Sequence, residues 1–128
     1  MKIVIPGKPM SANRMEGIRA VVTKDGRKFT QTYPTAEYKE FLERFKLATE
    51  ETTWPFEAAQ PLKITLTPRF SNRASDLDNV AKPTLDALQH VFMWNDKHVY
   101  EMHLYKEVVK KGEEELLIHV EELEKEAI

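Results

Sequence analysis

The sequence predicts an α+β fold, a single compact domain in which about two main helices pack on a mixed β-sheet. Its 128 residues suit one domain with one hydrophobic core, so residues 1–128 are treated as one unit. Two stretches, residues 35–52 and 78–92, repeat apolar residues at helical spacing. Several other stretches are short and apolar or alternate with polar residues, which is typical of strands.

The first part of the chain predicts a short strand followed by a hairpin. Residues 2–5 are apolar enough for a strand, and Pro6-Gly7 should end it. Residues 18–32 predict two strands around Asp25-Gly26, a dipeptide typical of hairpin turns. The few apolar side chains here predict a mobile hairpin, and its basic residues are Arg19, Lys24, Arg27 and Lys28.

Both helices carry local signals near their starts. Thr35 is the expected N-cap of the first helix, which should end near Thr52. The second helix should run from residue 78 to about residue 92, because Pro83 is tolerated only near a first turn. The inward faces are predicted to be Tyr38, Phe41, Leu42, Phe45 and Ala48 in the first helix, and Ala81, Leu85, Leu88 and Val91 or Phe92 in the second.

The remaining strands are predicted from alternation. Residues 62–69 alternate apolar and polar side chains and predict a half-buried strand. Residues 95–97 should form a loop, and residues 99–109 and 115–120 should pair as a hairpin around residues 110–113. Residues 113–128 then hold the last strand and an acidic C-terminal tail.

Composition excludes several classes of protein. The chain has no cysteine, which rules out disulfides, thiolate metal sites and cysteine nucleophiles. It has no P-loop or dinucleotide-binding glycine motif, so no nucleotide cofactor is expected. No apolar run approaches a membrane span and no secretory signal is recognisable, so we expect a cytoplasmic protein with no membrane partner.

For the question of phosphate binding, the distribution of charge along the chain is more informative than the net charge of −2. Residues 113–128 contain seven Glu and one Lys, and residues 1–112 contain 18 Lys and Arg against 14 Asp and Glu. The body of the protein is therefore mildly basic and could present a positive groove to phosphates.

The segment with the strongest chemical signal is Asp76-Leu77-Asp78-Asn79. If this segment is extended, Asp76 and Asp78 point to the same side, because side chains in a strand repeat every two residues. Two adjacent carboxylates repel unless a cation lies between them, and Mg²⁺ prefers such oxygen ligands. Together with Asp96, these residues predict a metal site that polarises a phosphate and activates a water.

Lys82 follows Asp78 by one helical turn and could stabilise charge on a transition state, with Asp86 holding it in place. A simpler interpretation exists for each of these residues. A D-x-D-N sequence before a helix is often only capping and turn chemistry, and Lys82 with Asp86 is by default a solvated ion pair. No histidine pair has zinc-enzyme spacing, so a zinc enzyme is not expected.

These residues together resemble the RusA family of Holliday junction resolvases, found in bacteria and prophages. The family pattern, roughly R-x-x-D-x-D-N-x-x-K-x-x-x-D-A-L, corresponds here to residues 73–88. A second element, an aspartate pair before a strand, corresponds to Asn95-Asp96, and residues 5–14 are similar to the family's P-x-x-x-N-R start. The resemblance spans residues 3 to about 120, and its first pattern is the most specific part.

The resemblance implies an Mg²⁺-dependent endodeoxyribonuclease, with Mn²⁺ as a substitute, that acts as a homodimer on four-way DNA. It implies metal ligands at Asp76, Asp78 and Asp96 and a catalytic lysine at Lys82. Asn95 replaces one aspartate of the pair, and the basic cluster before the D-x-D is reduced to Arg69 and Arg73. DNA binding is therefore expected to use Asn13, Arg14, Lys24, Arg27, Lys28, Arg69 and Arg73.

The predicted function is the resolution of Holliday junctions by paired symmetric nicks, in DNA recombination and repair. One alternative is a nuclease with the same chemistry that acts on flaps or forks. Another is a non-catalytic protein that binds branched DNA. Phe92, Met93 and Trp94 form an apolar run beside Asp96 that could be a dimer interface or could simply close the core.

Overall fold

The computed structural model describes residues 1–124, and the predicted acidic tail lies outside the described residues from position 125 onward. The main sheet consists of β1 (Lys2–Pro6), β4 (Leu62–Phe70), β5 (Val99–Leu104), β6 (Glu107–Val108) and β7 (Glu115–Glu122). The other elements are the hairpin strands β2 (Glu16–Val22) and β3 (Lys28–Pro34), helices α1 (Ala36–Thr49) and α2 (Ala81–Phe92), and 3₁₀ turns at Ala12–Arg14, Asp78–Val80 and Asp96–His98. The predicted α+β class is confirmed.

The sheet is mixed, with the order β1-β7-β4-β5, and β6 pairs with the end of β4. The predicted hairpin between residues 99–109 and 115–120 is wrong, because β4 lies between these segments. β5 pairs with β4 in parallel, whereas β7 pairs with β4 in the antiparallel direction. β4 is the longest strand, and it buries alternate residues along its length. It pairs with β5 on one edge and with β7 on the other.

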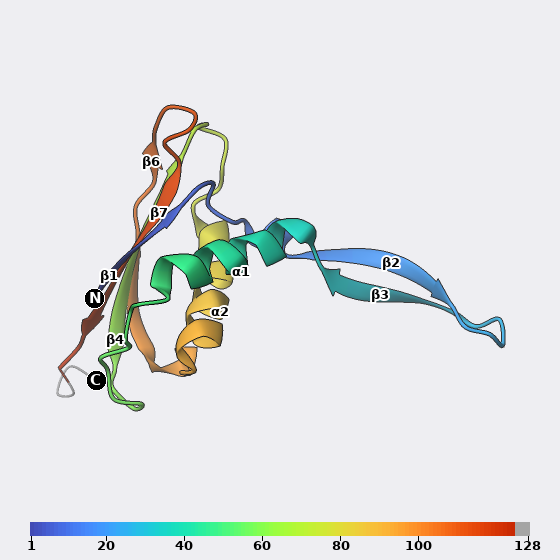
Figure 1. Ribbon diagram of the computed structural model, residues 1–128, viewed down its shortest axis with the longest axis horizontal. Coiled ribbons are helices and arrows are strands. Elements are labelled where there is room, and N and C mark those ends of the chain that lie inside the picture. The colour runs from blue at the N-terminus through green and yellow to red at the C-terminus, as the bar shows by residue number, and fades with distance from the viewer. Residues whose placement is uncertain (125–128) are drawn as a thin grey trace.

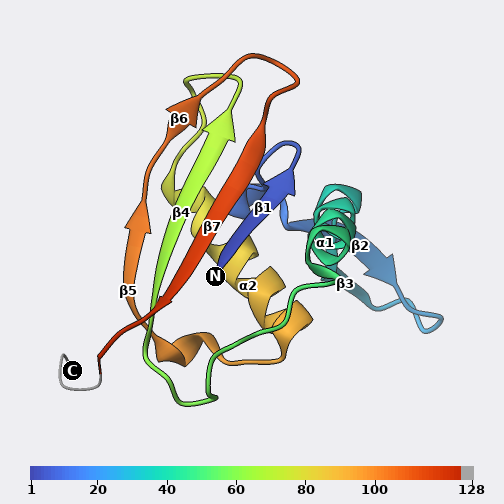
Figure 2. The same cartoon turned by 60° about the vertical axis from the view of Figure 1, so that its left-hand side comes forward.

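The two helices lie on the same side of the sheet, so the domain has two layers (Figures 1 and 2). The core between the layers contains Ile5, Phe41, Phe45, Ile64 and Leu66, all with no exposed surface. Thr35 caps α1 as predicted, since its side chain accepts a hydrogen bond from the Tyr38 backbone N–H. No helix within the described part of the chain is long and apolar enough to cross a bilayer.

The inward face of α2 agrees largely with the prediction. Leu88 is buried in the core, and Leu85, Val91 and Phe92 are half-buried and pack against it. Ala81 is half-buried. The buried residues of this helix that were not in the predicted set are Pro83, Thr84 and Ala87. Pro83 does lie in the first turn of α2, as predicted.

The hairpin β2–β3 projects away from the two-layer body as a separate two-stranded sheet (Figure 1). It is held at its base, where the backbone N–H of Thr35 donates to the Met15 carbonyl and the Thr35 hydroxyl donates to the Arg14 carbonyl. Every residue of β3 is exposed. The arm therefore has little core of its own, which fits the weak apolar pattern of its sequence.

Candidate active site

Asp76 lies on the loop that leaves the end of β4 and leads to α2. The side chains of Asn72 and Lys106 hold this loop in place through hydrogen bonds. The Asn72 Oδ1 atom accepts hydrogen bonds from the backbone N–H groups of Ala74 and Ser75, at 3.0 and 2.9 Å, and from the Ser75 hydroxyl. The ammonium group of Lys106, which follows β5, donates to the carbonyls of Arg73 and Ser75 at 2.7 and 2.5 Å. Asp76 is thus exposed directly after a segment, residues 73–75, that these hydrogen bonds hold in place.

The segment around Asp76 is not fully extended, so the strand argument for the direction of the two aspartates does not hold. Leu77 is in the right-handed helical region (φ −62°, ψ −43°), and Asp78 begins the 3₁₀ turn that leads into α2. Both carboxylates are exposed, as is Lys82 one turn further on. The predicted pair of Lys82 with Asp86 is present, with 3.6 Å between Nζ and Oδ2.

Asp86 also lies near a second ionisable side chain, Tyr38 of α1. Burial, and then the negative charge of Asp86, raise the pKa of the Tyr38 phenol above its ordinary value of 10.0. Asp86 therefore links the exposed Lys82 to the contact between the two helices.

Asp96 lies at the other end of α2 from Asp78. The helix has 12 residues, which corresponds to about 18 Å along its axis. β5 follows Asp96 and pairs with the beginning of β4, whereas Asp76 follows the end of β4. Asn95 caps the turn at Asp96 because its Oδ1 atom accepts from the Lys97 N–H, and the Asp96 N–H donates to Gln89.

The three predicted metal ligands are not brought together within one subunit. Among residues 1–124, no three histidine or acidic side chains are arranged to hold a metal ion. Asp76 and Asp78 are close in sequence and both exposed, so they suit a hard cation that keeps several waters. A set of three carboxylates would need a ligand from outside this subunit.

A cavity of about 440 Å³ opens beside Asp76. One wall is the loop after β4 with the start of α2, including Asn72, Ser75, Asp76 and Asn79. The other wall is the N-terminal segment after β1 with the first turn of α1, including Lys8, Ser11, Asn13, Arg14 and Glu37. The predicted residues Asn13 and Arg14 are therefore near Asp76, and Lys8 is an additional cation that the motif comparison missed.

The other predicted DNA-binding residues have different surroundings. Arg69 lies between Glu107 and Glu115, and its ion pairs with them, the first at 2.6 Å, raise the pKa of the guanidinium. Arg73 is exposed on the Asp76 loop. Lys24, Arg27 and Lys28 lie at the tip of the arm, where Arg27 pairs with Asp25 at 2.9 Å. Arg69 would have to break its ion pairs with Glu107 and Glu115 before its guanidinium could contact a phosphate.

The apolar run beside Asp96 is divided between two environments. Phe92 and Trp94 both pack on Trp54, with their ring centroids 5.0 and 4.9 Å from that of Trp54. These three side chains cover one edge of the core. Met93 is 86% exposed and has a left-handed backbone (φ 56°), which ends α2. Only Met93 of this run projects from the subunit.

The fold and the site define a class of protein. Two exposed carboxylates beside a cavity with lysine and arginine on its opposite wall, next to a projecting basic arm, are suited to acting on a polyanion through a hard cation.

A comparison with known families names that class. Residues 6–121 match the family described as endodeoxyribonuclease RusA, so the chain belongs to this family of hydrolases that cut phosphodiester bonds within DNA. A search of curated proteins found no match. The family match covers both walls of the cavity, the arm and Asp96.

Proposed function

We propose that this protein resolves Holliday junctions by paired symmetric nicks, as an Mg²⁺-dependent homodimer acting in DNA recombination and repair. The observation that carries the proposal is the position of Asp76 on a fixed loop, facing the cations of the N-terminal segment across a cavity. A site with both signs of charge can hold a metal ion on one wall and a DNA phosphate on the other.

In this proposal Asp76 and Asp78 hold Mg²⁺, or Mn²⁺ as a substitute, which supplies Lewis acidity and a more acidic water. Other side chains of the protein would position the Asp76 loop and stabilise charge on the phosphate. The Lys106 and Asn72 hydrogen bonds keep the loop of Asp76 in place. The Lys82 side chain is 70% exposed and its pair with Asp86 is long, at 3.6 Å, so its ammonium group could leave Asp86 and approach the charge that develops on the phosphate.

The homodimer is proposed because Asp96 and Asp78 lie at opposite ends of α2. A two-fold axis that is perpendicular to α2 and passes beside its middle would place the partner subunit's copy of the helix antiparallel next to it. The partner subunit's Asp96 would then lie near Asp76 and Asp78, and two equivalent three-carboxylate sites would form. Two identical sites related by two-fold symmetry also match the two equivalent strands that are cut in a four-way junction.

The test is subunit complementation on a synthetic four-way junction with Mg²⁺. Asp76→Asn and Asp96→Asn should each be inactive as homodimers. After the two variants are mixed and allowed to exchange subunits, each mixed dimer would contain one site with all three aspartates. We expect nicking of one strand per junction to return.

A matched control uses Asp76→Asn with Asp78→Asn, because both changes would damage the same half of the site. No mixed dimer of that pair contains an intact site, so nicking should stay absent. If Asp76→Asn and Asp96→Asn also stay inactive after exchange, the shared site is wrong. Full activity of the three single variants would refute these aspartates as ligands altogether.

Substrate class is tested with the same protein on four-way junctions, flaps, forks and linear duplexes. Preferential paired nicking of the four-way junction would support the proposed function. Faster cleavage of flaps or forks would instead support the related nuclease. Binding without cleavage of any substrate, with Mg²⁺ and Mn²⁺ both tried, would indicate a non-catalytic DNA-binding protein.

A further inference from the structure

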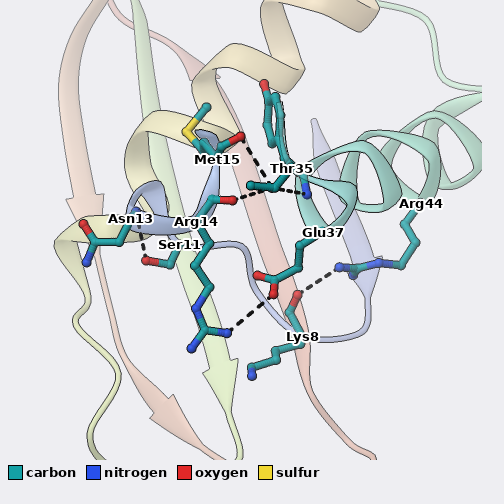
Figure 3. Close-up of polar contacts among 9 residues, drawn as sticks. Lys8, Ser11, Asn13, Arg14, Met15, Thr35, Glu37 and Arg44 are labelled. Atoms are coloured by element: carbon teal, nitrogen blue, oxygen red, sulfur yellow. Dashed lines mark hydrogen bonds and ion pairs between the residues drawn. The ribbon is translucent and has the colours of Figure 1, made fainter. Parts of the chain in front are cut away.

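The cavity wall opposite Asp76 carries two cations and one competing anion. Arg14 and Glu37 form an ion pair with 3.6 Å between Nη1 and Oε1, and both side chains are more than half exposed. Lys8 is exposed, and within residues 1–124 no carboxylate lies within ion-pair distance of it. Figure 3 shows the charged ends of Lys8, Arg14 and Glu37 directed to the same side.

The backbone beneath these side chains is held firmly. Arg44 of α1 donates to the Lys8 carbonyl at 3.0 Å, as Figure 3 shows, and to the Pro6 carbonyl at 2.6 Å. Gly7 lies against the same guanidinium and has a positive φ of 94°, so a larger residue would be strained and would collide with Arg44.

Further along the wall, the Ser11 hydroxyl accepts from the Asn13 N–H, and Thr35 binds the Arg14 carbonyl (Figure 3). Hydrogen bonds thus hold the backbone of this wall, whereas the charged groups of Lys8, Arg14 and Glu37 are exposed to solvent.

We propose that Lys8 and Arg14 form a binding site for one DNA phosphodiester next to the one that is cut, and that Glu37 competes with the DNA for Arg14. This inference rests on the proposed function, since it places a second phosphate of the same strand across the cavity from Asp76. Arg14 is paired with Glu37 in the free protein and exchanges it for a phosphate oxygen when DNA binds.

The energetics favour such an exchange. An exposed ion pair at 3.6 Å is weak, because water screens it and two long side chains lose freedom to form it. A phosphodiester offers two oxygens to the planar guanidinium, and DNA binding also releases condensed counterions. The cavity volume of about 440 Å³ leaves room for a phosphate and bridging waters. Glu37 then acts as a specificity-determining residue, because it weakens contacts with any DNA that does not fill the site.

The test measures the affinity for a four-way junction by fluorescence anisotropy in EDTA, where no cleavage occurs, over about 50 to 200 mM salt. Replacing Lys8 or Arg14 by Gln should each reduce the slope of log affinity against log salt by about 1. Glu37→Gln should raise the affinity about two- to fivefold, as expected for release of an exposed ion pair. In the Arg14→Gln background this gain should disappear.

Glu43→Gln is the matched control. Glu43 lies on the same helix and pairs with Lys46 at the same 3.6 Å distance, but it does not line the cavity. Glu43→Gln removes one negative charge, as Glu37→Gln does. An equal gain in junction affinity in Glu43→Gln would therefore overturn the specific role of Glu37. Unchanged salt slopes in both cation variants would overturn the phosphate site.

A parallel cleavage assay with Mg²⁺ separates this inference from the proposed function. Normal resolution with unchanged salt slopes overturns the phosphate site alone. Reduced slopes with no cleavage by the wild-type protein support the phosphate site and reject the nuclease function.

Discussion

Replacing Lys106 by methionine removes the ammonium group that donates to the carbonyls of Arg73 and Ser75, in the segment directly before Asp76. A typical hydrogen bond contributes about 0.5–1.5 kcal/mol net, and the lower half of that range applies to this exposed group. Two such bonds correspond to about 1.4 kcal/mol, which is a tenfold change in the population of the ordered loop. We expect the cleavage rate at saturating junction to fall about tenfold, with little change in junction affinity.

The Mg²⁺ dependence of the rate distinguishes this positioning role from a general structural one. A loosened Asp76 loop should raise the Mg²⁺ concentration needed for half-maximal rate, and Lys106→Arg should recover part of the loss because it keeps the donors. Lys110→Met is the control, because Lys110 is an exposed lysine whose side chain makes no hydrogen bond or ion pair within residues 1–124. An equal loss in Lys110→Met, or an unchanged Mg²⁺ dependence in Lys106→Met, would refute the reasoning.

Three further predictions concern stability, ionisation and assembly. Thr35→Ala removes the N-cap of α1 and should lower the free energy of unfolding by about 1 kcal/mol in a urea titration, whereas Thr35→Ser should change it little. Asp86→Asn removes the smaller cause of the raised Tyr38 pKa, so ultraviolet titration should show a lower pKa that still exceeds 10.0. In the wild type, the stability linked to this tyrosine is complete below pH 10 and is lost as the pH rises through the raised pKa. If the proposed homodimer uses Met93, Met93→Asp should weaken it in sedimentation without altering the stability of the single chain, because Met93 is 86% exposed; an unchanged dimer would place the interface elsewhere.

Local sequence signals predicted most of the elements correctly. The N-cap at Thr35, the hairpin around Asp25-Gly26 and the alternation of β4 all depend on neighbouring residues, so each can be recognised without the rest of the fold. The inward face of α2 was also predicted in large part from its periodicity, because Leu85, Leu88, Val91 and Phe92 all contribute to the core or pack against it.

The candidate site was only partly predictable. The motif predicted Asp76, Asp78 and Lys82 as site residues, because a carboxylate pair followed by a lysine one turn later has a chemical meaning at that spacing. Lys106 and Glu37 carry no such signal. Lys106 reaches a loop 31 residues earlier in the chain, and only the parallel pairing of β5 with β4 brings it there.

The sequence by itself determined where α1 is capped and which residues of β4 face the core, and it supplied the residues that are proposed to carry the chemistry. These properties follow from periodicity and hydrogen bonding over a few residues. Only the tertiary structure decided the strand order, the pairing of Arg14 with Glu37 and the separation of Asp96 from the other two aspartates. A periodic pattern specifies the face that is buried but not the partner that covers it. The 12 residues of α2 separate Asp78 and Asp96, which lie at opposite ends of this helix.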